Sequence, residues 1–417
     1  MTNPLQRLLD LTAEEKARLG VEATPGEIAQ QPEMWRDTAR RFAESAGRVR
    51  GLLASAGLRL GSTSPHPEHR RGAGLPGGAA EIVLGGAGTS DFVGRCVQGP
   101  VSRVLGTRCL AIPTTDIVTH PEDAFPTDRP AIMVSFARSG NSPESLAALD
   151  IALAERPAMR HLVITCNGEG ELARRAAGLS ERAVVLALHP RTNDRGLAMT
   201  SSFSSMVVAG LGLAYLDRVE EYVGLVDRMA GAGETMLQVM PEVAEMLTKR
   251  GPERACFLGS GSAFGAAVES HLKLQELTDG QLICFCDTFL GIRHGPRAAI
   301  RSNTLVVCFV ASDPHVRRYE LDLIRANRQQ RVGMAHLIVV GQAAGLHELA
   351  DEIVAFDPEG RLHLPDHMTA PVYTRAGQLL GLFASLARGL KPDVPSAGGV
   401  IHRVVQGVTI YPRERGL

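Results

Sequence analysis

One short segment of the sequence combines hydroxyl groups, a glycine and the start of a helix. Ser139-Gly-Asn-Ser142 follows an apolar run that ends at Phe136, and Pro143 suits the first turn of a helix. Backbone N–H groups and hydroxyls at a helix N-terminus bind a phosphate monoester without a large positive charge. A helix cap would need only Ser142, whereas several such groups gather here. We therefore predict a phosphate cradle of Ser139, Gly140, Asn141 and Ser142.

A second group of hydroxyls lies at Thr200-Ser-Ser-Phe-Ser-Ser205 and has no equivalent in the second half of the chain. These residues fit a phosphate site, and they equally fit a helix that begins with small side chains. Thr200 is therefore a candidate phosphate ligand with both interpretations open. The single occurrence favours one phosphate site per chain.

Lys273 and Glu276 are three residues apart, so on a helix they are neighbours. They could form an ordinary surface pair, but Leu272, Leu274 and Leu277 surround them. Burial disfavours the charged form of a carboxyl group and makes the carboxylate a stronger base. His294 follows shortly afterwards on a turn stiffened by proline. The three side chains are candidates for proton transfer.

Alternating patterns describe the elements that must position these residues. Short β-branched runs at Glu81–Leu84, Ala131–Phe136, His161–Thr165 and Ala183–Leu188 alternate with helical patterns. This alternation is typical of βαβ units with a parallel sheet covered on both faces. The spacing of apolar residues in 4–55 predicts helices, with a capping box from Thr12 to Glu15.

The same series of runs returns in the second half. Leu258 follows Leu84 by 174 residues, Thr304 follows Ala131 by 173, and His336 follows His161 by 175. So long a period indicates duplicated domains. The predicted layout is a helical arm with a hinge loop (1–77), a first α/β domain (78–215), a helical linker (216–250), a second α/β domain (251–390) and a tail (391–417).

Composition excludes several partners. The chain has 417 residues, with 44 Lys+Arg, 45 Asp+Glu and only 4% aromatic residues. There is no global charge to attract nucleic acid or an anionic membrane, and few platforms for base stacking. No 18-residue apolar run or signal pattern is present, so a cytoplasmic location is expected.

Cofactor signatures are also weak. The turn Gly85-Gly-Ala-Gly88 is not G-x-G-x-x-G, so a dinucleotide site is disfavoured. Seven cysteines without a C-x-x-C pair predict buried reduced thiols. His66 and His69 could bind a metal, but a solvated hinge loop is the preferred interpretation. We expect no cofactor and no metal.

These motifs together resemble the two-domain form of the sugar isomerase (SIS) superfamily. The branch that they resemble contains galactosamine-6-phosphate deaminases and tagatose-6-phosphate ketose/aldose isomerases. The similarity runs from about Thr24 to Tyr411 and includes S-G-N-S-P-E-S from Ser139, R-H-G-P from Arg293 and V-V-Q-G-V-T-I-Y from Val404. It implies two tandem flavodoxin-like domains, each a doubly wound parallel sheet in an αβα arrangement.

The resemblance also implies roles. It places Thr89 and Ser90 near the sugar, makes Glu276 the base beside Lys273, and makes His294 the ring-opening residue, contributed across a homodimer or larger homo-oligomer. Two departures are clear. Gln406 stands where relatives have a Schiff-base lysine, and Ala137 stands where they have a serine.

The expected reaction is deamination of galactosamine 6-phosphate to tagatose 6-phosphate and ammonia. Simple aldose–ketose isomerisation and deamination of glucosamine 6-phosphate stay open as alternatives. A sugar-phosphate sensor is a third alternative, although the mixed charges of residues 1–55 look like a solvated helix face rather than a DNA-binding arm.

Overall fold

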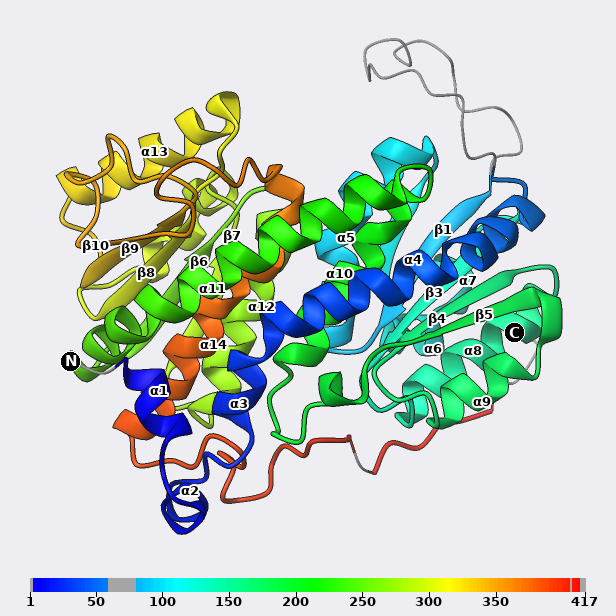
Figure 1. Ribbon diagram of the computed structural model, residues 1–417, viewed down its shortest axis with the longest axis horizontal. Coiled ribbons are helices and arrows are strands. Elements are labelled where there is room, and N and C mark those ends of the chain that lie inside the picture. Colours follow the sequence, from blue (N-terminus) through cyan, green and yellow to red (C-terminus); the bar gives the residue numbers. More distant parts are fainter. Residues whose placement is uncertain (1–2, 59–79, 406, 413–417) are drawn as a thin grey trace.

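The computed structural model describes residues 3–58, 80–405 and 407–412. Its first half contains a five-stranded, all-parallel sheet in the order β2-β1-β3-β4-β5 (Figure 1). The strands are β1 (Glu81–Gly86), β2 (Cys109–Pro113), β3 (Ala131–Ala137), β4 (Arg160–Thr165) and β5 (Ala183–Ala187). Every residue of β3 is buried, as expected for the middle of a sheet covered on both faces.

The second half repeats this sheet. Its order is β10-β9-β8-β6-β7, which is the same topology when read from β7. The strands are β6 (Arg254–Leu258), β7 (Ile283–Asp287), β8 (Thr304–Phe309), β9 (Ala335–Val340) and β10 (Glu352–Ala355). The predicted duplication of a doubly wound α/β unit is confirmed. The sequence patterns missed β2 and β10, two short edge strands without a strong apolar run.

Four helices of the described residues precede the first sheet: α1 (Pro4–Leu9), α2 (Ala13–Leu19), α3 (Thr24–Ala29) and α4 (Gln31–Ser55). The predicted capping box is present, because Thr12 accepts from the Glu15 N–H and Glu15 accepts from the Thr12 N–H. The first domain adds α5 (Thr89–Leu105), α6 (Thr114–Thr119), α7 (Pro121–Ala124), α8 (Pro143–Glu155), α9 (Glu171–Ala177) and α10 (Ser201–Leu211).

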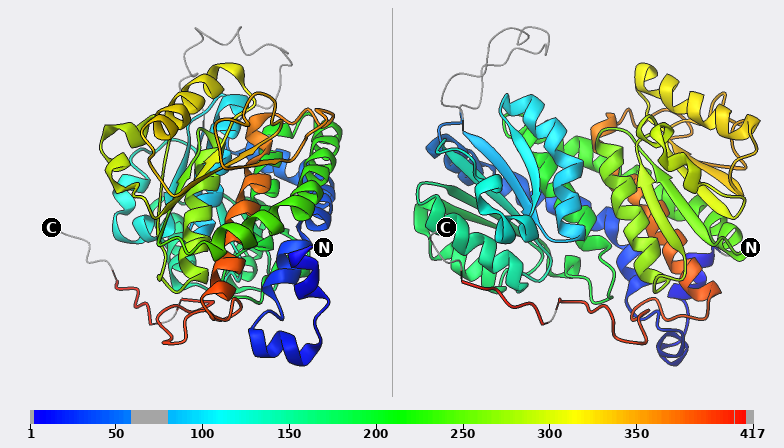
Figure 2. Two further views of the ribbon diagram at one scale, coloured as in Figure 1. Left: turned by 90° about the vertical axis from the view of Figure 1, so that its left-hand side faces the viewer. Right: turned by 180° about the vertical axis from the view of Figure 1, so that it is seen from behind.

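The second half adds α11 (Val219–Lys249), α12 (Ser262–Leu277), α13 (Pro314–Gln329) and α14 (Ala370–Ala387). Helices α4, α10, α11, α12 and α14 form a layer between the two sheets, while α8 and α9 cover one outer face and α13 the other (Figures 1 and 2). The main core joins the inner faces of both sheets through this layer. The two domains are therefore fused by packing as well as by the chain.

Polar groups inside this layer lock the N-terminal arm to both domains. Gln31 Nε2 donates to Gln378 Oε1 at 2.7 Å, and the Ser204 hydroxyl donates to Gln31 Oε1 at 2.8 Å. Trp35 Nε1 donates to Ser204 Oγ at 2.8 Å, and Trp35 is fully buried. Because a buried indole N–H needs an acceptor, Trp35 and Ser204 specify each other's positions.

The C-terminal tail returns from the second domain to the first. After α14 the described residues of the tail form no helix or strand and run along the outside of the molecule toward the first domain (Figure 2, red). Asp393 accepts from the N–H and hydroxyl of Thr24, and Leu197 N donates to Asp393 O at 3.0 Å. The tail thereby connects the N-terminal arm to the loop that follows β5.

Two sequence predictions concern properties of the whole chain. None of the helices among the described residues is long and apolar enough to span a membrane. Cys96, Cys109, Cys166, Cys256 and Cys308 are buried free thiols, as predicted, whereas Cys284 and Cys286 are half-buried.

Candidate active site

The site lies at the carboxyl edge of the first sheet, where β1 and β3 are hydrogen-bonded neighbours. The turn after β1 leads directly into α5, which begins with the buried residues Thr89 and Ser90. Gly86 is required at this turn, because a Cβ there would lie 2.3 Å from the backbone carbon of Ser90. The loop after β3 carries the predicted cradle. In parallel sheets this edge is where ligands bind.

Lys273 of α12 connects the second domain to this edge. Its ammonium donates to Glu276 Oε2 at 2.5 Å and to Thr89 Oγ1 at 3.0 Å. Lys273 is fully buried, while the Glu276 side chain keeps 23% of its exposure. The structure thus brings three of the predicted site residues together, across the boundary between the two domains.

Glu269, one turn before Lys273, is a third charged residue that the sequence interpretation did not select. Its Oε1 lies 3.4 Å from Lys273 Nζ, and neither carboxyl oxygen has a hydrogen-bond partner among the described residues. Burial raises the pKa of Glu269 to about 8, against the opposing effect of Lys273. Burial acts to lower the pKa of Lys273, but the two carboxylates outweigh it and raise that pKa. Lys273 is therefore a charged ammonium.

The loop after β3 leads into α8, whose N-terminal backbone amides have no side-chain cap. Ser142 occupies the N-cap position of α8, yet its side chain does not cap the helix and instead bonds to Ser145 Oγ at 2.7 Å. Gly140 has a φ of +68°, which favours glycine. The Ser139 hydroxyl accepts from Asn141 N at 3.2 Å. The amides at the start of α8 are left for a ligand.

Asn141 is mainly engaged with the neighbouring helix. Its side-chain oxygen accepts from Glu171 N at 2.9 Å, at the start of α9. Gly140 O accepts from Leu172 N at 2.9 Å, so the cradle loop is fastened to α9. Asn141 therefore shapes the loop with its side chain and has its backbone N–H turned toward Ser139.

The second domain has a different arrangement at the equivalent place. The loop after β8 leads through Asp313 into α13, and the Asp313 carboxylate accepts from His315 N at 2.9 Å and Val316 N at 3.0 Å. Asp366 accepts from the backbone N–H groups of Ser312 and Asp313. Carboxylates thus accept from the amides at the start of α13, whereas α8 has no side-chain cap.

Thr200 lies in a buried network around Asp194. Asp194 Oδ2 accepts from Thr200 N at 2.7 Å, Ser202 N at 2.8 Å and the Ser202 hydroxyl at 2.6 Å. Thr200 Oγ1 lies 3.4 Å from Asp194 Oδ1. Asp194 thus caps the N-terminus of α10 from the preceding loop. Burial raises the pKa of Asp194, although its hydrogen bonds to Thr200 and Ser202 act to lower it. The hydroxyls of Thr200 and Ser202 are therefore engaged within the protein.

Arg138 is a further functional candidate missed from the sequence, although it directly precedes the motif that begins at Ser139. It follows β3, precedes Ser139 and is buried. Its guanidinium donates to Leu197 O at 3.0 Å and to the carbonyl of Arg403 in the tail. A charged residue directly after an apolar strand was the signal available in the sequence.

His294 lies on the surface of this chain. It ends the short 3₁₀ helix η5 (Gly291–His294), and it is exposed together with Arg293, Gly295 and Pro296. No hydrogen bond or ion pair joins it to Lys273 or Glu276 among the described residues. The predicted loop histidines His66 and His69, and Gln406, lie outside the described residues.

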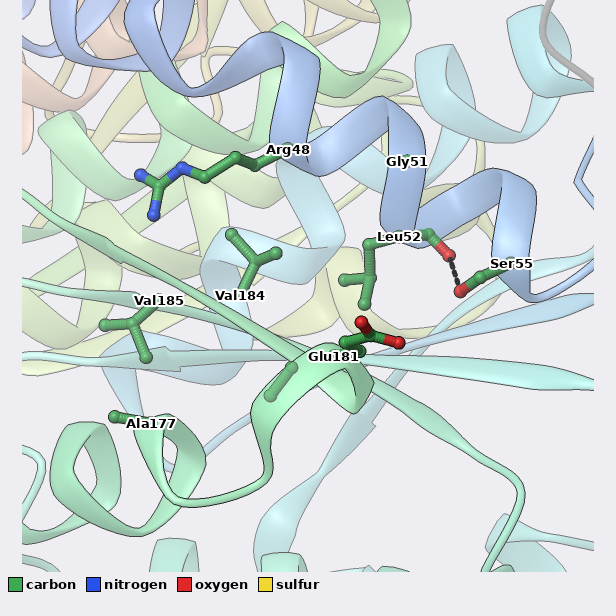
Figure 3. Close-up of a pocket in the computed structure, with 9 residues that line it drawn as sticks. Arg48, Gly51, Leu52, Ser55, Ala177, Glu181, Val184 and Val185 are labelled. Atoms are coloured by element: carbon green, nitrogen blue, oxygen red, sulfur yellow. Dashed lines mark hydrogen bonds between the residues drawn. The ribbon is translucent and has the colours of Figure 1, made fainter.

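A cavity lies apart from this site. It has a volume of about 510 Å³ and opens between α4 and the edge strand β5, where Leu52 faces Val184 (Figure 3). Its walls are largely apolar, and none of the predicted site residues line it. Within the described parts of the chain, no group of three or more His, Cys, Asp or Glu side chains could hold a metal ion.

Comparison with known proteins identifies the family. No protein-family model matches the chain. The AgaS relative of Streptomyces coelicolor is 39% identical over 391 residues, covering 93% of this chain and 95% of that protein. D-galactosamine-6-phosphate deaminase AgaS of Escherichia coli is 38% identical over 334 residues, covering 79% and 85%. The chain belongs to the AgaS family.

A solved member extends this result to the fold. The crystal structure of tagatose-6-phosphate ketose/aldose isomerase from Escherichia coli superposes with a TM-score of 0.79 at 33% identity, covering 93% of this chain and 96% of that chain. The predicted two SIS-like domains are confirmed. The AgaS relatives carry two activity names, a deaminase and an isomerase, for similar chains.

Proposed function

We propose that this AgaS protein deaminates D-galactosamine 6-phosphate, giving tagatose 6-phosphate and ammonia. The observation that carries the proposal is the buried Lys273, bonded to the partly exposed Glu276 of its own helix and to Thr89 of the other domain. A carboxylate with one face open and a fixed ammonium beside it suits proton transfer next to a developing oxyanion. The AgaS relatives named as deaminases support the choice of substrate.

In the proposed reaction, Glu276 removes the proton from C2 of the open-chain amino sugar and returns it to C1. The electron pair of the C2–H bond forms an enolamine, and reprotonation at C1 leaves a ketimine at C2. Water then adds to C2, the C–N bond breaks, and ammonia and the ketose leave. Lys273 stabilises negative charge on O1 during the first step.

The phosphate is proposed to bind at the start of α8. Ser139 and Ser142 supply hydroxyls, and the uncapped helix supplies backbone N–H groups and the positive end of its dipole. Thr89 and Ser90 are proposed to lie along the sugar. The capped α13 of the second domain supports a single phosphate site per chain.

His294 is proposed to open the sugar ring in the site of a second copy of the chain. It is exposed here, and it makes no hydrogen bond or ion pair with Lys273 or Glu276 in the described chain. The site would then be composite, and the active form would be a homodimer or a larger homo-oligomer.

Replacing Glu276 with glutamine tests the reaction. Glu276→Gln keeps the size of the side chain but removes the base, so kcat for ammonia release should fall by about 10²-fold or more. Glu245→Gln is a matched control, because Glu245 also bonds to a lysine on its own helix, at 3.1 Å, but lies on α11 away from the site. Unchanged turnover in Glu276→Gln would exclude this residue as the base.

Simple isomerisation is the second candidate, because a solved relative bears an isomerase name. The two activities separate in one assay with two readouts. Galactosamine 6-phosphate and glucosamine 6-phosphate are supplied in parallel and ammonia is measured, and tagatose 6-phosphate is supplied alone and aldose formation is measured. Aldose formation without ammonia release from either amino sugar would establish the isomerase.

A further inference from the structure

Arg138 joins four parts of the molecule at the edge of the site. It lies between β3 and the cradle, and its guanidinium donates to Leu197 O at 3.0 Å and Gly196 O at 3.4 Å in the loop after β5. It also donates to the carbonyl of Arg403 in the tail. Both terminal nitrogens thus bond to backbone carbonyls of segments that have no regular structure.

The charge of Arg138 has no direct counter-ion. No ion pair within 4.0 Å joins it to a carboxylate of the described chain, and its residue is only 8% exposed. Burial and the nearby Arg403 lower its pKa, while Asp194 and Glu276 act in the opposite direction. A buried cation satisfied only by neutral carbonyls is costly to maintain, which favours a role in the site over a purely structural one.

We propose that Arg138 is a positioning residue for the reaction, holding the 196–197 loop and the tail against the proposed phosphate cradle with its guanidinium. The inference rests on the proposed function, since the cradle binds substrate only if the chain acts on a sugar phosphate. It adds a role for the tail, whose contact with the site is the carbonyl of Arg403.

Two substitutions remove the contacts of Arg138 to different extents. Arg138→Lys keeps a positive charge but loses the planar fork, whereas Arg138→Gln loses both. For Arg138→Gln we expect kcat/KM to fall by about 10²-fold, because the loop and the tail are no longer held beside the cradle. For Arg138→Lys we expect a smaller fall in kcat/KM.

Trypsin supplies a readout that does not depend on activity. The carbonyl that Arg138 holds belongs to the Arg403–Val404 bond, which trypsin would cleave. Cleavage at this bond in the native protein should be severalfold faster in Arg138→Lys than in the wild type. Arg388→Gln is the control, because Arg388 also donates to backbone carbonyls, of Pro252 and Ala384, at the far end of α14.

The outcomes are distinct. An unchanged kcat/KM in Arg138→Gln, or an equal fall in Arg388→Gln, overturns the role in the reaction. Equal trypsin cleavage in the wild type and Arg138→Lys overturns the positioning of the tail. If the wild type releases no ammonia from either amino sugar phosphate, the proposed function fails, and the trypsin comparison still decides the contact with the tail.

Discussion

Glu269 is the acidic side chain of the site that is farthest from solvent. It is fully buried beside Lys273, and its carboxyl oxygens have no hydrogen-bond partner among the described residues. A carboxylate in such a place is unstable unless it takes up a proton or faces a cation. The folded protein therefore holds a proton on Glu269 over a range of pH in which the unfolded chain does not.

This difference predicts a pH dependence of stability. The pKa of Glu269 is about 8 in the folded state, against the ordinary value of 4.5 that applies in the unfolded chain. Between these two pH values the folded state therefore binds more protons than the unfolded chain. The free energy of unfolding must fall as pH rises through this window, by up to about 1.4 kcal/mol per pH unit from one group. Glu269→Gln removes the titration, and its urea midpoint should fall less between pH 5 and 8.

The comparison of wild type and variant isolates Glu269 from other buried acids. Burial raises the pKa of Glu27 and of Glu320 to about 7 as well, so both proteins retain part of the slope. Parallel stability profiles for the wild type and Glu269→Gln would show that Glu269 is not protonated in the folded state.

At the scale of residues, the sequence predicted a contacting pair of side chains better than the larger polar networks around it. The spacing of Lys273 and Glu276 on a helix was enough to place them together. Glu269 stands one turn away and could have been included by the same rule, since it is four residues before Lys273. Asp194 could not be predicted, because its partners at the start of α10 reach it only through the path of the folded loop.

At the scale of elements, the contact between α5 and α12 determines whether the site forms. Gly265 of α12 faces α5 so closely that a Cβ there would lie 2.6 Å from Cys96 Sγ and 2.7 Å from Cys96 N. The same two helices carry Thr89 and Lys273, whose hydrogen bond crosses between the domains. Any increase in the spacing of α5 and α12 therefore lengthens the distance between Thr89 and Lys273.

Replacing Gly265 with alanine tests this coupling. Overpacking should destabilise the protein by about 1–3 kcal/mol and should also lower kcat at temperatures where the variant is fully folded. Gly47→Ala is the matched control, since a Cβ on this α4 glycine meets nothing within 4 Å. That variant should be as stable as the wild type or more stable, by about 0.4–1 kcal/mol, with unchanged kcat. Full activity in folded Gly265→Ala would show that the site does not depend on the spacing of α5 and α12.

The predicted elements follow the strength of their local signals. Buried central strands such as β3 and β8 appear in the sequence as continuous apolar runs, so their positions were predictable. The tail carries no comparable pattern, and its route depends on distant partners such as Thr24 and Arg138. The contact of the tail with Arg138 could therefore not be predicted from local sequence patterns.

At the scale of the whole molecule, the exposed His294 predicts how activity depends on assembly. Glu276→Gln and His294→Gln should each be nearly inactive. If each site uses Glu276 of one copy and His294 of another, mixing the variants under subunit exchange creates intact sites. A random 1:1 mixture of dimers would recover about a quarter of the wild-type activity.

The alternative arrangement gives a different result. If His294 acts on Glu276 of its own chain, no mixture of the two variants contains a complete site, and activity stays at the level of the separate variants. Unmixed samples at the same total concentration are the control.

The two halves of the chain share a topology but differ at the residue before one proline. Where the first half has Ser142 before Pro143, the second has Asp313 before Pro314, and that aspartate fills the amides of its own helix. The aspartate acts as a covalently attached anion mimic, always present at high local concentration. An acidic residue at this position therefore closes the helix N-terminus of the second copy to other anions, while that copy still contributes Lys273 and Glu276 to the site of the first.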